Sequence, residues 1–325
     1  MAEILSLAAS NLISPIILSF VLGLAAALAR SDLSIPEAVA KGMSIYLLFA
    51  IGFKGGAGVA AHGLDITLVS TLVVALLLSF AIPFVAFFLL GVMTRLNTVD
   101  RAAVAAHYGS ISIVTFVAAT SVLETRGIAS EGYMVAAAAV MEAPAILSAL
   151  WLIARTGEQT NTDSGLYREI LLNGSIVLLV GSFLIGAITG EDGLEKISSF
   201  IVSPFQGVLC LFLLDMGLVA GRGLRESWRE LGLGSVAFGM LMPLIGSVFG
   251  FFAALAVGLS PGGAALLMTL SASASYIAVP AAMRVALPEA RPSIYLTLSL
   301  GVTFPFNLAI GIPLYTSIAT TFGGG

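Results

Sequence analysis

Two short clusters of hydroxyl-bearing residues lie inside apolar stretches that are long enough to cross a membrane. The first is Gly109-Ser-Ile-Ser-Ile-Val-Thr115, and the second is Leu270-Ser-Ala-Ser-Ala-Ser-Tyr-Ile-Ala-Val-Pro280. Pro280 lacks a backbone N–H and biases Val279 away from helical geometry. Serine and alanine also allow close helix packing, which is the alternative explanation of such a stretch. An interrupted helix at membrane depth is tolerated only where it is buried in protein or lines a cavity, so the clusters predict two enclosed, broken helices.

The two clusters occupy corresponding positions in two halves of the chain. The spacing of Ser110 and Ser112 recurs at Ser271 and Ser273. Polar interruptions at matching positions of two halves are the best sequence indicator of a transporter's binding site. Helix packing alone does not predict such a pairing, so the repetition favours a binding site over simple packing.

Interrupted helices offer binding groups for both signs of charge. The N-terminal end of a half-helix presents backbone N–H groups and a positive dipole end, which suit an anion. Carbonyl groups at the C-terminal ends, together with side-chain oxygens, suit a coupling cation such as Na⁺. The candidate anion site is formed by Ser110, Ser112, Thr115, Ser271, Ser273, Ser275, Tyr276 and Pro280. The candidate Na⁺ ligands are Glu142, Thr303, Asn307, Ser112 and Ser273.

Two carboxylates, Glu142 and Asp215, are predicted to lie well inside membrane-spanning segments. Each costs about 2.5–3.5 kcal/mol or more at the bilayer centre, so each is a functional candidate by default. Glu142 falls at the predicted depth of the first break, and its alternative role is a protonated side chain bonded to a neighbouring helix. Asp215 is interpreted as either structural or a ligand, and Lys54 is its expected partner.

The composition is that of a polytopic membrane protein. The chain has 325 residues, of which 58% are hydrophobic and 10% charged, and its mean hydropathy is +1.06. The single cysteine excludes an intramolecular disulfide, and His62 and His107 lack neighbours at zinc-ligand spacing. No basic stripe suits nucleic acid, and no nucleophile–base set suits an enzyme. The first apolar segment lacks a signal-peptide pattern, so we expect it to be retained as a span.

Ten spans follow from the requirement for about 20 apolar residues per crossing. The fifth and sixth are separated by a polar linker. The expected spans are Asn11–Ala29, Pro36 to Lys54, Thr67–Val92, Asp100–Glu124 (broken), Gly132–Ile153, Ile170–Thr189, Ile197–Ala220, Leu231–Leu259, Gly262–Leu287 (broken) and Ser293–Thr320. The expected division is a first repeat over 1–157, a cytoplasmic linker over 158–165 and a second repeat over 166–325.

The halves are predicted to be inverted repeats. Glycines over Gly42–Gly56 match those over Gly207–Gly221, and the offset of the broken helices places Pro144 on Pro305. Five spans per half is an odd number, so the second half must enter the membrane in the opposite orientation. The expected fold is therefore all-α, with ten transmembrane helices in two inverted five-helix repeats and with helices 4 and 9 broken.

Loop charges predict that both termini lie on the extracytoplasmic side of a bacterial plasma membrane. With that orientation, most of the 14 basic residues lie on the cytoplasmic side, as the positive-inside rule requires. Lys54, Arg126 and Lys196 alone lie outside. The basic segment Arg222–Arg229 is interpreted as a solvated inside loop rather than as a docking helix.

The chain resembles the cyanobacterial sodium-dependent bicarbonate transporter family over almost its whole length. The resemblance is carried by Gly109–Thr115, Met141-Glu-Ala-Pro-Ala-Ile, the run from Ser273 through Pro288-Glu-Ala-Arg-Pro292-Ser-Ile-Tyr295, and Pro305 to Gly311-Ile-Pro313-Leu. It implies symport of bicarbonate with Na⁺, two broken helices that meet at the site, and an elevator-like movement. It also implies a homotrimer and a regulatory partner similar to the PII family.

Several polar groups of the family pattern are replaced here. Where that pattern reads Ser-Gly-Ser-Thr, this chain has Ser112-Ile-Val-Thr115, and where it reads Asp-Ile-Ser-Gly-Pro-Pro-Thr, this chain has Tyr276-Ile-Ala-Val-Pro-Ala-Ala282. The intramembrane Asp before Pro is here Glu142, a conservative change. The added apolar side chains favour a less hydrated anion, such as a small carboxylate.

The predicted function is therefore Na⁺-coupled symport of bicarbonate or a similar small anion across the lipid bilayer. A symporter of organic carboxylates, of the ten-helix bile-acid transporter kind, is the alternative within this class. An anion channel or a substrate sensor on a transporter scaffold is the alternative from another class.

Overall fold

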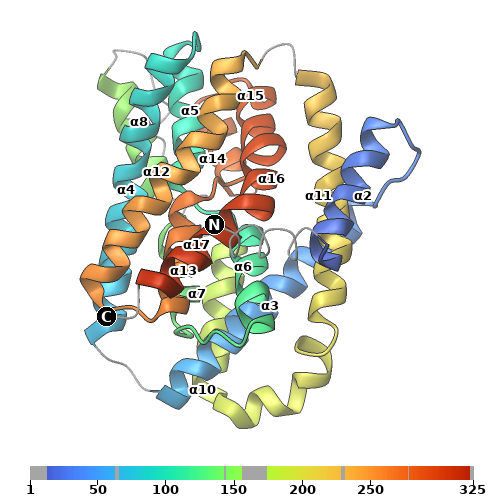
Figure 1. Cartoon of the computed structure of the whole chain (residues 1–325), viewed down its shortest axis with the longest axis vertical. Coiled ribbons are helices and arrows are strands. Elements are labelled where there is room, and N and C mark those ends of the chain that lie inside the picture. The colour runs from blue at the N-terminus through green and yellow to red at the C-terminus, as the bar shows by residue number, and fades with distance from the viewer. Residues whose placement is uncertain are drawn as a thin grey trace.

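The computed structural model describes residues 13–62, 66–142, 144–155, 174–227, 231–276 and 278–322, and these residues form helices without strands. In this part of the chain, eight helices are long and apolar enough to cross a membrane, and α2 and α13 are shorter apolar helices (Figure 1). The expectation of an all-α polytopic membrane protein is confirmed. The predicted linker over 158–165 lies outside the described residues.

Four helices form a framework in which the two halves of the chain alternate. Helix α2 (Pro15–Leu28) packs along α11 (Phe205–Ser227), and α3 (Glu37–His62) packs along α10 (Gly174–Ile201). Figure 1 shows α2 and α11 side by side at one edge of the molecule.

Glycines make this close packing possible. A side-chain carbon at Gly56 of α3 would collide with the Phe183 carbonyl of α10, and one at Gly217 of α11 would collide with the Phe20 carbonyl of α2. Small residues let helix backbones approach in this way within a membrane. The matching glycines in the sequence therefore lie in α3 and α11. Each of these two helices packs against the first helix of the other half, α3 against α10 and α11 against α2.

The remaining helices form a central bundle. It contains α4 (Ile66–Met93), α5 (Thr98–Gly109), α6 (Ile113–Thr125), α7 (Met134–Val140), α8 (Pro144–Arg155), α12 (Leu233–Val257), α13 (Pro261–Ala272), α14 (Ala278–Ala286), α15 (Pro292–Leu296), η1 (Thr297–Thr303), α16 (Phe304–Phe306), η2 (Asn307–Gly311) and α17 (Ile312–Phe322). Helices α4 and α12 pack on α5 and α13, the helices that precede the two breaks.

The segment from Thr98 to Thr125, which contains the first break, is enclosed by protein. Its most apolar window is 100% buried, compared with 17% for Val177–Ile201 in α10 and 28% for α4. Irregular backbone at membrane depth must be shielded from lipid, since nothing there can satisfy its polar groups. The outer helices therefore present apolar side chains outward, and the broken helix lies inside.

Two expected spans have different courses. The fifth, expected to be continuous, is interrupted: α7 ends at Val140 and α8 begins at Pro144. The tenth stays helical around Pro305 but widens into the π-helical turns η1 and η2. A proline removes one hydrogen bond from a helix and collides with the preceding turn, and a chain can respond by breaking or by widening.

The expected end of the sixth span, Thr189, directly precedes a kink at Gly190, whose φ is 61°. Further helical turns then continue from the kink to Ile201. Glycine tolerates this left-handed backbone without steric cost, so the chain can change direction there.

An ion pair joins the start of α5 to the start of α15. Asp100 is 1% exposed, and its Oδ1 accepts from the Arg291 backbone N at 2.9 Å. Its Oδ2 accepts from Arg291 Nε at 2.9 Å and from Nη2 at 2.7 Å. A carboxylate that satisfies both a guanidinium and a helix N-terminus is among the stronger polar contacts. It fixes the entry to the first broken helix against the second half.

A related contact lies at the start of α13. Glu131, which precedes α7, accepts from the Ser260 backbone N at 2.7 Å and from Ser260 Oγ at 3.0 Å. Ser260 in turn caps α13 by accepting from Gly263 N at 3.1 Å. Each broken helix therefore begins at a carboxylate contact with the other half. In Figure 1, α5 and α15 lie at the top of the molecule, and α7 and α13 lie lower.

The Asp100 contact predicts a measurable loss of stability. We expect Asp100→Ala to lower the unfolding free energy by about 1–3 kcal/mol, because Arg291 and the first turn of α15 lose a charged hydrogen-bond partner. Thermal unfolding of detergent-purified protein measures the change. Asp192→Ala, at an exposed carboxylate of α10, is the control and should unfold like the wild type. Equal unfolding temperatures for all three proteins would contradict the structural role of Asp100.

Candidate functional site

The first break is a short extended segment between α5 and α6. Helix α5 ends at Gly109, whose missing side chain leaves room for Pro83 and the Ser79 carbonyl of α4. Ser112 caps α6, because its Oγ accepts from Thr115 N at 3.2 Å and from Thr115 Oγ1 at 2.9 Å. The cap explains why the chain resumes a helix immediately after the interruption.

The second break lies between α13 and α14. Helix α13 ends at Ala272, and Ser273 Oγ donates to the Leu270 carbonyl at 2.8 Å. Helix α14 begins at Ala278, so Pro280 lies in its first turn, where proline is tolerated. The interruption therefore precedes Pro280 and is formed by the small polar residues of Ser273–Tyr276.

The two breaks are hydrogen-bonded to each other. Ser112 N donates to Ser273 Oγ at 2.9 Å across a sequence separation of 161 residues. Ser275 N donates to the His107 carbonyl, a group freed at the end of α5, at 2.7 Å. Residues at matching positions of the two halves thus meet in the interior of the bundle.

Two matching serine hydroxyls lie at the C-terminal ends of α5 and α13. Ser110 Oγ and Ser271 Oγ are buried and make no hydrogen bond with the described residues. Each lies two residues from the Ser112–Ser273 contact. Most buried polar side-chain atoms are hydrogen-bonded, so a matched pair of unsatisfied hydroxyls indicates a place for a bound polar species.

Glu142 lies in the interruption between α7 and α8. It is 5% exposed, and its Oε2 is buried without a hydrogen-bond partner among the described residues. Ser79 connects this interruption with the first break: its Oγ donates to the Met141 carbonyl at 2.7 Å, and its own carbonyl is close to Gly109. The expected proximity of Glu142 to the first break is thus supported through a residue that both contact.

The candidate ligands of the tenth span already have protein partners. Thr303 Oγ1 donates to the Gly239 carbonyl at 2.8 Å and is also bonded to the Tyr108 hydroxyl. Asn307 Nδ2 donates to the Ala272 carbonyl at 2.9 Å, and its Oδ1 accepts from the Tyr315 hydroxyl at 2.9 Å. Asn307 therefore satisfies the C-terminal end of the half-helix α13.

Tyr276 lies within the second break rather than behind it. Its ring packs edge-on against Phe304 with centroids 5.5 Å apart, and its buried hydroxyl has no hydrogen-bond partner among the described residues. Ser275 Oγ is 3.5 Å from Val279 N, at the start of α14. The structure thus brings Ser112, Ser273, Ser275 and Tyr276 together.

The expected Lys54–Asp215 pair is wrong. Lys54 forms an ion pair with Glu124 of α6 instead. Lys54 and Asp215 lie in the two helices that match by sequence, α3 and α11, but α3 packs mainly on α10 and α11 packs mainly on α2.

Ser79, Tyr108 and Asp100 contribute to the site or its support, and the sequence interpretation omitted them. A usable signal for Ser79 was Pro83, one turn later in the same apolar helix. For Asp100 the signal was Asn97, whose Oδ1 accepts from Asp100 N at 2.7 Å and caps α5. Tyr108 gave no signal, since its partner Thr303 is distant in sequence.

Stability measurements separate the binding hydroxyls from the structural one. We expect Ser110→Ala and Ser271→Ala to unfold at or above the wild-type temperature in ligand-free detergent, because neither hydroxyl has a hydrogen-bond partner among the described residues. Ser79→Ala should lose about 1–3 kcal/mol, since it leaves a buried carbonyl unpaired. Thermal unfolding tests both statements. Equal destabilisation by all three substitutions would show that the two break serines are structural.

Comparison with known proteins assigns the chain to a family. No curated protein matches it. The family model described as the Na⁺-dependent bicarbonate transporter superfamily matches residues 15–320, which include both breaks, Glu142 and the whole framework. The chain is therefore a multi-pass membrane transport protein that belongs to the Na⁺-dependent bicarbonate transporter superfamily.

Proposed function

We propose that the protein is a Na⁺-coupled symporter of bicarbonate or a similar small anion. The observation that carries this proposal is the pair of hydrogen-bonded breaks with matching unsatisfied hydroxyls at Ser110 and Ser271. The family supports Na⁺ dependence and bicarbonate as the first cargo to test. Broken helices that present both N-terminal and C-terminal ends to one place can hold an anion and a cation together.

The anion is held at the N-terminal ends of α6 and α14. These ends offer backbone N–H groups and positive dipole ends, and the hydroxyls of Ser110 and Ser271 add two donors. Ser112, Thr115, Ser273 and Ser275 act mainly by holding the breaks in place through the contacts described above. Tyr276 and Pro280 shape the second break.

Na⁺ is held where the C-terminal ends of α5 and α13 release backbone carbonyls. Glu142 supplies the negative charge, because its Oε2 is buried and has no hydrogen-bond partner in the part of the chain that the structure describes. Thr303 and Asn307 can contribute oxygens after exchanging their present partners, and Ser112 and Ser273 lie between the two breaks. Co-binding follows, since the charge of each ion lowers the cost of burying the other.

We further propose that ten spans form two inverted repeats, over 1–157 and 166–325. The reciprocal packing of α2 on α11 and of α3 on α10 supports this arrangement, as does the direct contact between Ser112 and Ser273. Positive-inside loops support extracytoplasmic termini in a bacterial plasma membrane. The homotrimer and the PII-like regulator stay predictions from the family resemblance.

Alternating access by an elevator-like movement is the proposed mechanism. The central bundle carries both breaks, while the framework helices pack chiefly on one another. Movement of the bundle against the framework would carry the bound ions without separating the Ser112–Ser273 contact. The two carboxylate contacts, at Asp100 and at Glu131, lie within the bundle and so would move with it.

A small organic carboxylate is the second candidate cargo. Ile111, Ile113 and Val114 are buried at the first break, and their apolar side chains suit an anion with a short hydrocarbon group. Competition by formate, acetate and pyruvate in the same uptake assay separates the two cargoes.

Uptake into proteoliposomes tests the proposal. An inward Na⁺ gradient should drive accumulation of labelled bicarbonate by the wild type, and a choline gradient should not. Glu142→Gln should reduce uptake to the Na⁺-free level, because the cation loses its carboxylate. Ser110→Ala should weaken it about tenfold or more, as expected for one lost hydrogen bond to a charged ligand.

Glu195→Gln, at an exposed carboxylate of α10, is the matched control and should transport normally. Na⁺-dependent uptake of a carboxylate without bicarbonate uptake would retain the mechanism and change the cargo. Anion flux that is independent of Na⁺ would contradict symport.

A further inference from the structure

A cavity of about 680 Å³ lies between the framework and the central bundle. Residues of α3, α6, α7, α11 and α13 line it, including Ile51, Lys54, Phe116, Glu124 and Leu266. Among the described residues that line this cavity, Lys54 is the only one with a basic side chain. The cavity therefore has a single positive centre.

Lys54 is held by a contact that a competing anion can replace. Its Nζ pairs with Glu124 Oε1 and lies 5.5 Å from the centre of the Phe205 ring. The Lys54 side chain is 26% exposed and that of Glu124 is 44% exposed. A partly exposed ion pair contributes little, because water solvates both charges when they separate. Glu124 can thus swing into solvent while Lys54 stays in the cavity.

The other carboxylate in this cavity does not compete for Lys54. Both oxygens of Glu131 are bonded to Ser260, at 2.7 and 3.0 Å. If an anion displaced Glu124 from Lys54, Glu131 would therefore stay bonded to Ser260 and would not take its place.

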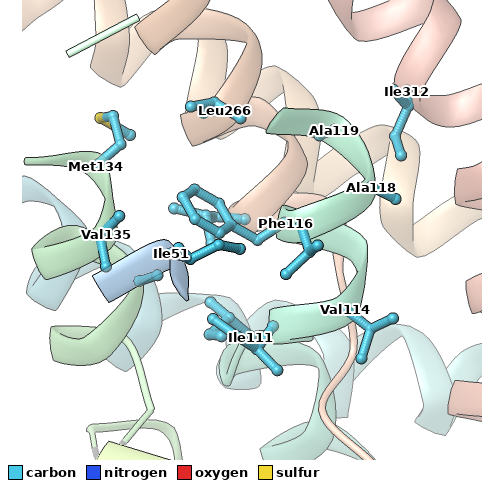
Figure 2. Packing of buried hydrophobic residues seen from close by; sticks show 14 of the residues in the cluster. Ile51, Ile111, Val114, Phe116, Ala118, Ala119, Met134, Val135, Leu266 and Ile312 are labelled. Carbon is cyan, nitrogen blue, oxygen red and sulfur yellow. The ribbon is translucent and has the colours of Figure 1, made fainter. Parts of the chain in front are cut away.

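The cavity ends on an apolar floor close to the first break. Ile51 of α3 and Phe116 of α6 line it and are both buried. Figure 2 shows their side chains projecting toward one another, with Ile111 of the break in the same cluster. Phe116 is one helical turn from the cap, since its N donates to the Ser112 carbonyl at 3.0 Å. A hydrated anion in the cavity is thus separated from the break by this floor.

We propose that the cavity is an entry vestibule in which a small anion binds Lys54 in exchange for Glu124. The identity of the anion rests on the proposed function, and bicarbonate is the probe. Among the described residues, Lys54–Glu124 is the only ion pair that joins the framework to the bundle. Binding of the anion to Lys54 therefore also breaks the ion pair between α3 and α6. These two helices contribute Ile51 and Phe116, the residues of the apolar floor.

The test uses labelling of a cysteine in the cavity, which is independent of transport. Cys210 is the only cysteine of the chain, so Cys210→Ser gives a cysteine-free background. Thr120→Cys then places a reporter on the cavity wall, one turn from both Phe116 and Glu124. A sulfonate-bearing methanethiosulfonate labels the purified protein in Na⁺-free buffer, with increasing choline bicarbonate. The measured quantity is the bicarbonate concentration that halves the labelling rate.

Substitutions of Glu124 and of Lys54 should change the half-protecting bicarbonate concentration in opposite directions. Glu124→Gln should lower the half-protecting concentration about fivefold, because it removes the competing carboxylate, and Lys54→Gln should raise it at least as much. Lys54→Arg should retain protection. An uncharged maleimide should label all variants at one rate, which verifies that the cavity is intact.

Shifts in the same direction for both substitutions, or no protection by bicarbonate in the reporter protein, would overturn the inference and leave a structural ion pair. The uptake assay is separate. Lys54-dependent protection without Na⁺-driven uptake would contradict the proposed function alone. Na⁺-driven uptake without Lys54-dependent protection would contradict the vestibule alone.

Discussion

The structure depends on one constraint: backbone groups that a helix releases at membrane depth must find partners inside the protein. The two breaks meet this constraint jointly. Ser112 N donates to Ser273 Oγ, and Ser275 N donates to the His107 carbonyl. Asn307 satisfies a third group, the Ala272 carbonyl. Because each break supplies partners to the other, neither could persist alone, and both halves of the chain are required for one site.

The surrounding helices serve this centre in two ways. Within the bundle, helices α4 and α12 pack on α5 and α13 and leave apolar side chains on the outside, which shields the irregular backbone from lipid. The framework uses glycines at Gly56 and Gly217 to pack its helices without side chains between them. Carboxylate contacts at Asp100 and Glu131 then fix the starts of the two broken helices. Among the buried polar atoms for which the described residues offer no hydrogen-bond partner, those of Ser110, Ser271, Tyr276 and Glu142 belong to the breaks and the interruption beside them. This clustering points to a bound species there rather than to poor packing.

Much of this arrangement could be predicted from the sequence, because it follows from local pattern. Apolar run length predicted an all-α polytopic membrane protein, and eight long apolar helices are present in the described residues. The recurrence of two serines at one spacing predicted where α5 and α13 end and that these places meet. What failed depended on tertiary geometry. Pro144 and Pro305 occupy matching positions, yet the chain is interrupted before one and widens into π-helical turns around the other. Lys54 was assigned to Asp215 because their helices match in sequence, whereas matching helices pack on different partners. Tyr108 is bonded across the fold to Thr303, and no local pattern marks Tyr108.

The central claim is that ions bind where the two breaks meet. A cryo-EM map of the protein in lipid nanodiscs with sodium bicarbonate tests it most directly. The account predicts non-protein density in contact with the hydroxyls of Ser110 and Ser271, and a second density beside the carboxylate of Glu142. Density elsewhere in a protein active in uptake, with Ser110, Ser271 and Glu142 bonded only to protein, would contradict it.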